Sequence, residues 1–231
     1  MNSQAQSRKT RDLHAAPRGQ GLLELLIAIG IISASAVGTL TLVLGTTTVS
    51  SASKSQVLAM NLAREGIEVA RSIRDSNWLA LDGGAVPAPV NGWLTGLQSG
   101  TDYSAIPRFV PTASAWFFEF AGVAEGDLGA TNTRVYLHPV DRTYIQQQTA
   151  PAAPYVATDY WRVVTLKPIC WNESQVGRAQ DTELLVAGDG STCGPGSPNQ
   201  AGIEIRSLVR WLDRNRTRNL TVTEKIYNWK N

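Results

Sequence analysis

The sequence has only two histidines in 231 residues, and one of them, His138, lies beyond the N-terminal region. With so little histidine, no His-based metal site can be drawn from repeated ligand spacing. A Gly-x-Ser-x-Gly nucleophile elbow and a phosphate-binding loop ending in Lys-Ser or Lys-Thr are also lacking. We therefore expect no catalytic residue, no metal and no cofactor, and a protein that is not an enzyme.

The net positive charge of the chain comes from its N-terminus. From residue 20 onward the chain holds 17 basic and 18 acidic side chains, a net charge of −1. A surface that binds nucleic acid needs a basic excess to neutralise phosphates. No nucleic-acid partner is therefore expected. The residues that make the N-terminus basic are Arg8, Lys9, Arg11 and Arg18, opposed only by Asp12.

Charge is lacking altogether from residues 25–45, a mostly apolar run of 21 residues. As a helix this run spans about 30 Å, the thickness of a bilayer's hydrocarbon core. The basic cluster precedes it and Lys54 is the next charge after it, so the positive-inside rule places the N-terminus in the cytoplasm and residues 54–231 outside. The alternative is a secretory signal peptide cleaved near Ser51, Ala52 and Ser53, although such peptides usually have apolar runs of about 7–15 residues.

Glu24 is the carboxylate at the start of this apolar run. An unpaired carboxylate in a membrane helix is costly and usually marks a partner or a proton path. The alternative is that Glu24, close to the cytoplasmic end, reaches headgroup water at little cost. The residue by itself does not decide between these readings, so its neighbours must.

Residues 18–29 read Arg-Gly-Gln-Gly-Leu-Leu-Glu-Leu-Leu-Ile-Ala-Ile. This segment resembles the prepilin cleavage and methylation motif of type IV pilins and pseudopilins, which combines a basic leader, a Gly, a Glu at fixed offset and a long apolar run. The resemblance implies that a prepilin peptidase/methyltransferase cuts after Gly19 and leaves Gln20 as the new N-terminus. It also implies that Glu24 serves assembly by pairing with the N-terminal amine of a neighbouring subunit.

Two features of the segment leave alternatives open. The family usually has Phe or another apolar residue where Gln20 stands, and a free N-terminal Gln can cyclise instead of being methylated, which removes the amine. Gly30, Ala34 and Gly38 fall four residues apart and let a second helix approach one face closely. The alternative for these three is ordinary small residues in a lone span.

A helical stripe continues beyond the apolar run and predicts one amphipathic helix to about Ser76. Its members recur at spacings of four, four, three and four: Leu58, Leu62, Gly66, Val69 and Ile73. Glu68 and Arg71 are spaced to pair on its polar side. Residues 38–50 have poor helix propensity, which predicts a weaker part of the helix. Residues 62–78 also resemble the distal helix of prepilin-like proteins.

The remaining sequence predicts a sheet. Residues 79–100 are rich in Gly, Pro and Ala and predict loop. Strands are expected at 116–121, 134–140, 160–168, 203–211 and 220–229, the last two joined as a hairpin around residues 213–216. A long helix followed by about five strands is an α+β fold, with the outer half of the helix on an antiparallel sheet, as in pilins.

We therefore divide the chain into a leader (1–19), a transmembrane and assembly half of the helix (20–53), an amphipathic half (54–78) and an outward-facing β-rich head (79–231). The expected core comprises Leu58, Leu62, Val69, Ile73, Val163, Leu166, Val209 and Trp211. Cys170 and Cys193 are the only cysteines, and an outward-facing compartment permits them to pair. Two free thiols in a reducing compartment are the alternative.

Three functions fit these patterns. The first is a structural subunit of a type IV pilus or pilus-like filament, with other pilin subunits and the prepilin peptidase as partners. It would reside in the cytoplasmic membrane before assembly and in an extracellular filament afterwards. The second is a pseudopilin of a secretion or DNA-uptake machine. The third is a singly anchored surface binding protein that does not assemble.

Overall fold

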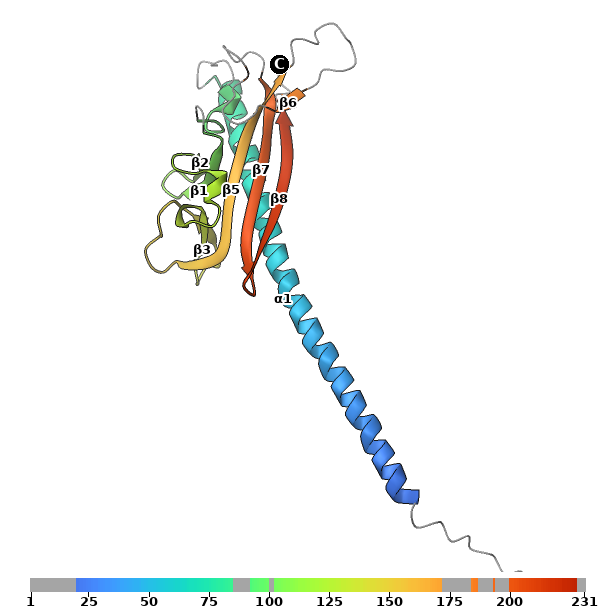
Figure 1. The fold of residues 1–231 in the computed structure, drawn as a ribbon. Coiled ribbons are helices and arrows are strands. Elements are labelled where there is room, and N and C mark those ends of the chain that lie inside the picture. The colour runs from blue at the N-terminus through green and yellow to red at the C-terminus, as the bar shows by residue number, and fades with distance from the viewer. Residues whose placement is uncertain are drawn as a thin grey trace, which may run out of the picture. The chain divides into compact units, whose positions relative to one another are not determined.

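The computed structural model describes residues 20–84, 92–99, 102–171, 184–186, 193 and 200–227. It divides into two compact units, Met1–Ser51 and Ala52–Asn231. The described part of the first unit is the beginning of a helix, α1, which runs over Gln20–Asp82. The second unit holds the rest of α1 and an antiparallel sheet (Figure 1). The coarse α+β prediction is confirmed.

Helix α1 is longer than the sequence predicts, since it ends at Asp82 and not near Ser76. Tertiary contact explains the extra turns. Trp78 is buried, and its ring lies 6.3 Å from that of Trp93, in the short 3-10 helix η1 (Gly92–Leu94). Residues 38–50 are helical as well, despite their poor propensity. Part of the stretch 79–100, expected to be loop, is therefore helix, and residues 85–91 lie outside the described residues.

Among the described residues the sheet has eight strands, each paired antiparallel to its neighbours. In chain order they are β1 (Ser104–Val110), β2 (Ala115–Glu119), β3 (Arg134–Leu137), β4 (Tyr144–Gln146), β5 (Val156–Trp171), β6 (Leu184–Val186), β7 (Gln200–Asp213) and β8 (Arg216–Tyr227). Short 3-10 helices η2 (Glu125–Asp127) and η3 (Thr131–Thr133) link β2 to β3. Strand β5 is the centre of the sheet, because β1, β3, β6 and β7 all pair with it.

The predicted hairpin at residues 213–216 is confirmed. Strands β7 and β8 stay in register from Gly202 opposite Tyr227 to Asp213 opposite Arg216. The two residues between them, Arg214 and Asn215, have φ of 48° and 64°. Positive φ at both central residues matches the turn to the twist of the flanking strands.

Three strands were not predicted from the sequence, and the bounds of the others differ. The sequence did not predict β1 because it contains Pro107, and proline argues against a strand assignment. In the structure Pro107 lies beyond Ser104 and Ala105, the two residues of β1 that pair with β5. Strands β4 and β6 have only three residues each. The run predicted at 134–140 ends at Leu137, where a turn begins in which the Arg142 N–H donates to the His138 carbonyl.

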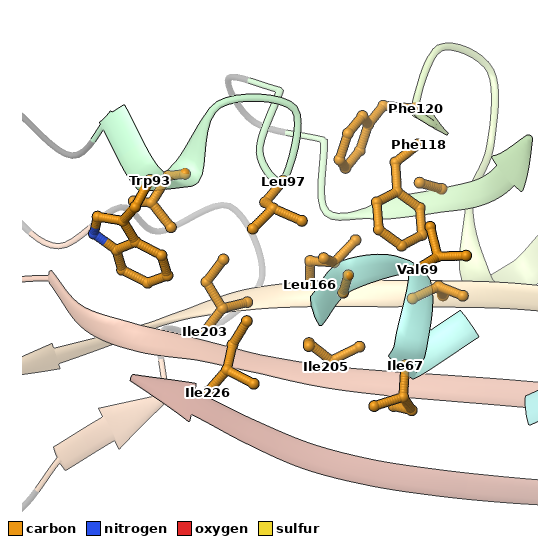
Figure 2. Close-up of a cluster of buried hydrophobic side chains, with 14 of the residues drawn as sticks. Ile67, Val69, Trp93, Leu97, Phe118, Phe120, Leu166, Ile203, Ile205 and Ile226 are labelled. Atoms are coloured by element: carbon orange, nitrogen blue, oxygen red, sulfur yellow. The ribbon is translucent and has the colours of Figure 1, made fainter. Parts of the chain in front are cut away.

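The second half of α1 packs on the sheet through two clusters of buried side chains. The proximal cluster joins Ala59, Leu62 and Ala63 of α1 to Val135, Val209 and Trp211. The distal cluster joins Ile67, Val69, Ala70 and Trp78 to side chains of the sheet, of η1 and of the turn after η1, among them Trp93, Leu97, Phe118, Leu166, Ile203, Ile205 and Ile226 (Figure 2). An outer cluster of Ile106, Val123, Leu128, Trp161 and Val163 is separate from both.

The predicted core is confirmed for six of its eight members, which are Leu62, Val69, Val163, Leu166, Val209 and Trp211. Leu58 and Ile73 are only partly buried, because they pack on the edges of the proximal and distal clusters. The described cysteines Cys170 and Cys193 form a disulfide, with a Cα–Cα distance of 5.3 Å. The two cysteines are 23 residues apart in sequence. Closing a loop of that length stabilises a fold by about 3 kcal/mol in the chain-entropy account.

Candidate functional site: the apolar segment of α1

Residues 21–50 of α1, the apolar segment, expose all of their described side chains to solvent. Large apolar side chains such as Leu22, Leu26, Ile32, Leu42 and Val49 are each more than half exposed. An 18-residue window here has a mean hydropathy of 2.2, and by length and composition α1 can cross a membrane once. A soluble monomer rarely exposes so large an apolar surface, so the segment needs an apolar environment or a partner.

Five hydroxyl groups of the apolar segment donate hydrogen bonds within the helix itself. Ser35 donates to the carbonyl of Ile31 at 2.8 Å, and Thr41 donates to that of Val37 at 2.9 Å. Thr39, Thr46 and Thr47 each donate to the carbonyl three residues earlier. Such bonds remove the cost of placing a hydroxyl in hydrocarbon. These five residues are therefore compatible with a bilayer.

Glu24 is the charged residue of the apolar segment and its side chain is exposed. It lies one turn beyond Gln20, which is helical in its backbone. Gly19, the predicted cleavage residue, lies outside the described residues. In a bilayer an unpaired Glu24 carboxylate would carry a free-energy penalty that a cationic partner would remove.

The predicted helix-packing face is open in this chain. Side chains built onto Gly30 or Gly38 would meet no atom within 4 Å, and Ala34 between them is exposed. A flat surface of small residues lets the backbone of another helix come close. The face is therefore free to receive one.

Gly66 has the opposite environment, at a point where α1 passes too close to the sheet for a side chain. A Cβ atom there would lie 2.7 Å from Ser207 Oγ and 2.8 Å from Val164 Cγ2. Real Cβ atoms do not approach other atoms so closely. The sequence placed Gly66 on the apolar stripe of the helix, but only the structure shows that the site requires glycine.

Arg162 is a fully buried charge between α1 and the sheet, with 2% of its side chain exposed. Its guanidinium donates to the Leu62 carbonyl of α1 at 2.8 Å and to Gln146 Oε1 at 3.0 Å, and lies 3.3 Å from a Glu65 carboxylate oxygen. Burial lowers the pKa of Arg162 from its ordinary value, and the attraction of Glu65 offsets this only in part. The sequence singled out neither residue.

We expect Glu65→Gln to lower the free energy of unfolding of the second unit by about 3 kcal/mol, because it leaves a buried cation without a counter-charge. Arg162→Met should lower the free energy of unfolding by less than Glu65→Gln does. It removes the desolvated charge, and water can hydrate the Glu65 carboxylate that remains, because this side chain is 34% exposed. Urea unfolding of the full chain in detergent measures both. Glu68→Gln is the matched control, because Glu68 is 62% exposed and its pair with Arg71 contributes little. Equal losses in Glu65→Gln and Glu68→Gln would contradict the argument.

Two further features bear on alternative functions. Within the described ranges, no group of three or more His, Cys, Asp or Glu side chains is placed to hold a metal ion. A cavity of about 490 Å³ lies in the second unit, with Phe109, Trp116, Tyr144, Tyr155 and Arg162 among its lining residues. Its size is in the range of small-molecule pockets.

Comparisons of this chain with family models, with curated proteins and with solved structures find no match.

Proposed function

We propose that this chain is a type IV pilin-like subunit, which is processed after Gly19, held in the membrane by α1 and built into a filament through the same helix. The observation that carries the proposal is the apolar segment, a span-length helix with every described side chain exposed. It needs two successive environments, the bilayer before assembly and the helices of neighbouring subunits afterwards. The motif of residues 18–29 supports the same function.

The chemistry of assembly follows from the charge in this segment. An unpaired Glu24 carboxylate in the bilayer carries a free-energy cost. In a bundle of apolar helices this cost would be larger, unless a cation lay beside the carboxylate. The N-terminal amine of Gln20 on an adjacent subunit is the proposed cation. Pairing the two charges offsets the desolvation of each and fixes the axial register of the incoming subunit. Gly30, Ala34 and Gly38 supply the face on which the helices pack.

Processing gives the direct test. The mature wild-type protein is expected to start at Gln20, and Gly19→Val should leave residues 1–19 attached, because the proposed peptidase needs a small residue at the cut. Intact mass and N-terminal peptide mapping of membrane-purified protein measure this. Gly21→Ala is the matched control, since it alters the next glycine without entering the cut residue. A wild-type N-terminus at Lys54 would indicate a signal peptide, and a Gly19→Val protein with unchanged mature mass would refute the proposed cleavage.

A singly anchored binding protein is the second candidate, and the aromatic cavity of the second unit favours it. The two functions differ in what the apolar segment contacts. A filament subunit exchanges lipid for other copies of α1, whereas an anchor keeps lipid around it. Cross-linking between apolar segments on the cell surface therefore separates them. A pseudopilin shares the motif and the helix, and differs in forming its filament within a secretion or DNA-uptake machine.

A further inference from the structure

One end of the second unit combines exposed arginines with exposed apolar side chains. Residues 210–219, around the turn between β7 and β8, contain four arginines and a single carboxylate, Asp213. Arg214, Arg216 and Arg218 are exposed. Leu212, beside them, is 44% exposed. We call residues 212–218 the hairpin tip. Its composition contrasts with the near-neutral charge of the chain from residue 20 onward.

The hairpin tip lies at the end of the second unit where this unit joins the apolar segment. Strand β7 runs from the distal cluster, which holds Ile203 and Ile205, to the proximal cluster, which holds Trp211. Along α1 the same direction leads from Trp78 back to Ala59. Tyr160, opposite Trp211 in the sheet, donates to the Ser55 carbonyl of α1 at 3.4 Å. The turn between β7 and β8 lies beyond Trp211 along β7. Figure 1 shows this turn at the lower end of the sheet.

Other exposed apolar side chains lie at the same end of the sheet. Val156 starts β5, four residues before Tyr160, and is 55% exposed. Leu137 of β3 pairs with Val156, so the turn that follows β3 extends further still, and Val140 in this turn is 78% exposed. The register places Arg216 and Arg218 on the face of the hairpin opposite to Leu212, so the basic and apolar side chains share one end of the sheet and not one face of it. Basic and apolar side chains together are the combination that binds at the interface of an anionic membrane.

Chain connectivity brings this surface within reach of a bilayer. Gly45, the last residue of the mostly apolar run 25–45, is ten residues before Ser55. That connection is helical and so about 15 Å long. The hairpin tip extends about 10 Å beyond Trp211, because each residue of an antiparallel strand adds about 3.4 Å. Arginine is also suited to phosphate, since its planar guanidinium donates two hydrogen bonds in parallel.

We propose that the hairpin tip docks on the phosphates of anionic lipids while α1 is in the membrane, with Leu212 and Val156 entering the headgroup boundary. The tip follows the span by more than 150 residues, so its positive charge does not oppose the predicted topology, which depends on residues close to the span. Docking holds the second unit in one orientation on the bilayer before assembly. This inference rests on the membrane-spanning part of the proposed function and not on filament formation.

The test uses the mature full-length chain, one copy per lipid nanodisc, with hydrogen exchange of the hairpin tip as the readout. Exchange should be slower in discs that contain phosphatidylglycerol than in discs of phosphatidylcholine alone, and 1 M salt should abolish the difference. Each arginine is expected to contribute about fivefold to the ratio of docked to undocked protein, so Arg216→Gln with Arg218→Gln should lower that ratio about 25-fold. Lys225→Gln is the control on the same strand, because Lys225 pairs with Glu204 near the other end of β8.

The outcomes separate the two proposals. Equal exchange in both kinds of disc, or an equal effect of Lys225→Gln, would overturn the lipid site. Slow exchange that appears only when several copies share a disc would also overturn it, and would make a second copy of the chain the occupant. Resistance of the protein to alkaline extraction is measured alongside. If alkali extracts the wild-type protein from membranes, the proposal of a membrane-held subunit is refuted. If the protein resists extraction but hydrogen exchange of its hairpin tip is not slowed by anionic lipid, only the proposed lipid site is refuted.

Discussion

Filament yield is expected to fall to background in Glu24→Ala, while the processed protein accumulates in the membrane. Removing the carboxylate lowers the cost of inserting the apolar segment, so export and membrane retention should not suffer. The folded sheet belongs to the second unit and Glu24 to the first, so folding should be unchanged as well. The loss must then come from a partner that needs the charge. Sheared filaments and membrane-retained mature protein, quantified from the same cells, measure the effect.

Two companion variants sharpen this test. Ser35→Ala removes another polar group of the apolar segment, but the Ser35 hydroxyl already donates to its own helix, so assembly should be normal. Glu24→Gln keeps hydrogen bonding and removes the charge. Loss in both Glu24 variants indicates a charged amine on Gln20, whereas loss in Glu24→Ala alone indicates a hydrogen-bonded partner, as expected if Gln20 has cyclised. Wild-type filament yield in both variants would contradict a role for Glu24 in assembly.

Gly66→Val is expected to destabilise the second unit by about 3 kcal/mol, at the upper end of overpacking costs. Its Cβ would lie 2.7 Å from Ser207 Oγ and 2.8 Å from Val164 Cγ2, and its two methyl groups would add further volume at this contact. Such a loss is a large part of the roughly 5–15 kcal/mol that stabilises a typical domain. Denaturant unfolding, followed by the tryptophan fluorescence of the full chain in detergent, measures it.

The matched control is Gly38→Ala, at another glycine of the same helix. Nothing lies within 4 Å of the Cβ position of Gly38, so the change should not destabilise the second unit. A second variant pair locates the clash. Ser207 Oγ is buried and has no hydrogen-bond partner among the described residues, so Ser207→Ala should be close to neutral and should relieve part of the cost of Gly66→Ala. Equal stability of Gly66→Val and wild type would contradict the close approach of α1 to the sheet.

Local patterns predict the helix and the long strands well, because their signals repeat along the chain. The stripe from Leu62 to Val69 is buried as expected, and the Glu68–Arg71 pair is present, with 2.6 Å between nitrogen and oxygen. The turn at Arg214 and Asn215 was also predicted, since polar residues interrupt two runs of strand-forming residues. These predictions need only neighbours in sequence.

Contacts between distant residues explain most of what the sequence did not predict. The last turn and a half of α1 forms because Trp78 packs against Trp93, and strand β1 forms although it contains Pro107. The contacts of the buried Arg162 with Glu65 and Gln146 have no local signature, since the three residues come from β5, α1 and β4. For the candidate site, residues 18–29 had to be interpreted by their resemblance to a family, because hydropathy alone indicates a span and not an assembly surface.

The contacts that join α1 to the sheet impose an order on how the protein is made. Arg162 meets the carbonyl of Leu62 across 100 residues of sequence, and Arg71 meets Glu224 across 153. Folds that depend on such distant contacts form slowly, since the chain between the partners must be closed first. For a chain exported in the proposed topology, α1 enters the membrane early and its sheet-facing side waits uncovered until β8 has been translocated. In that topology, folding of the second unit would be completed only after nearly the whole polypeptide had crossed, and α1 in the membrane would keep the unfinished chain from diffusing away.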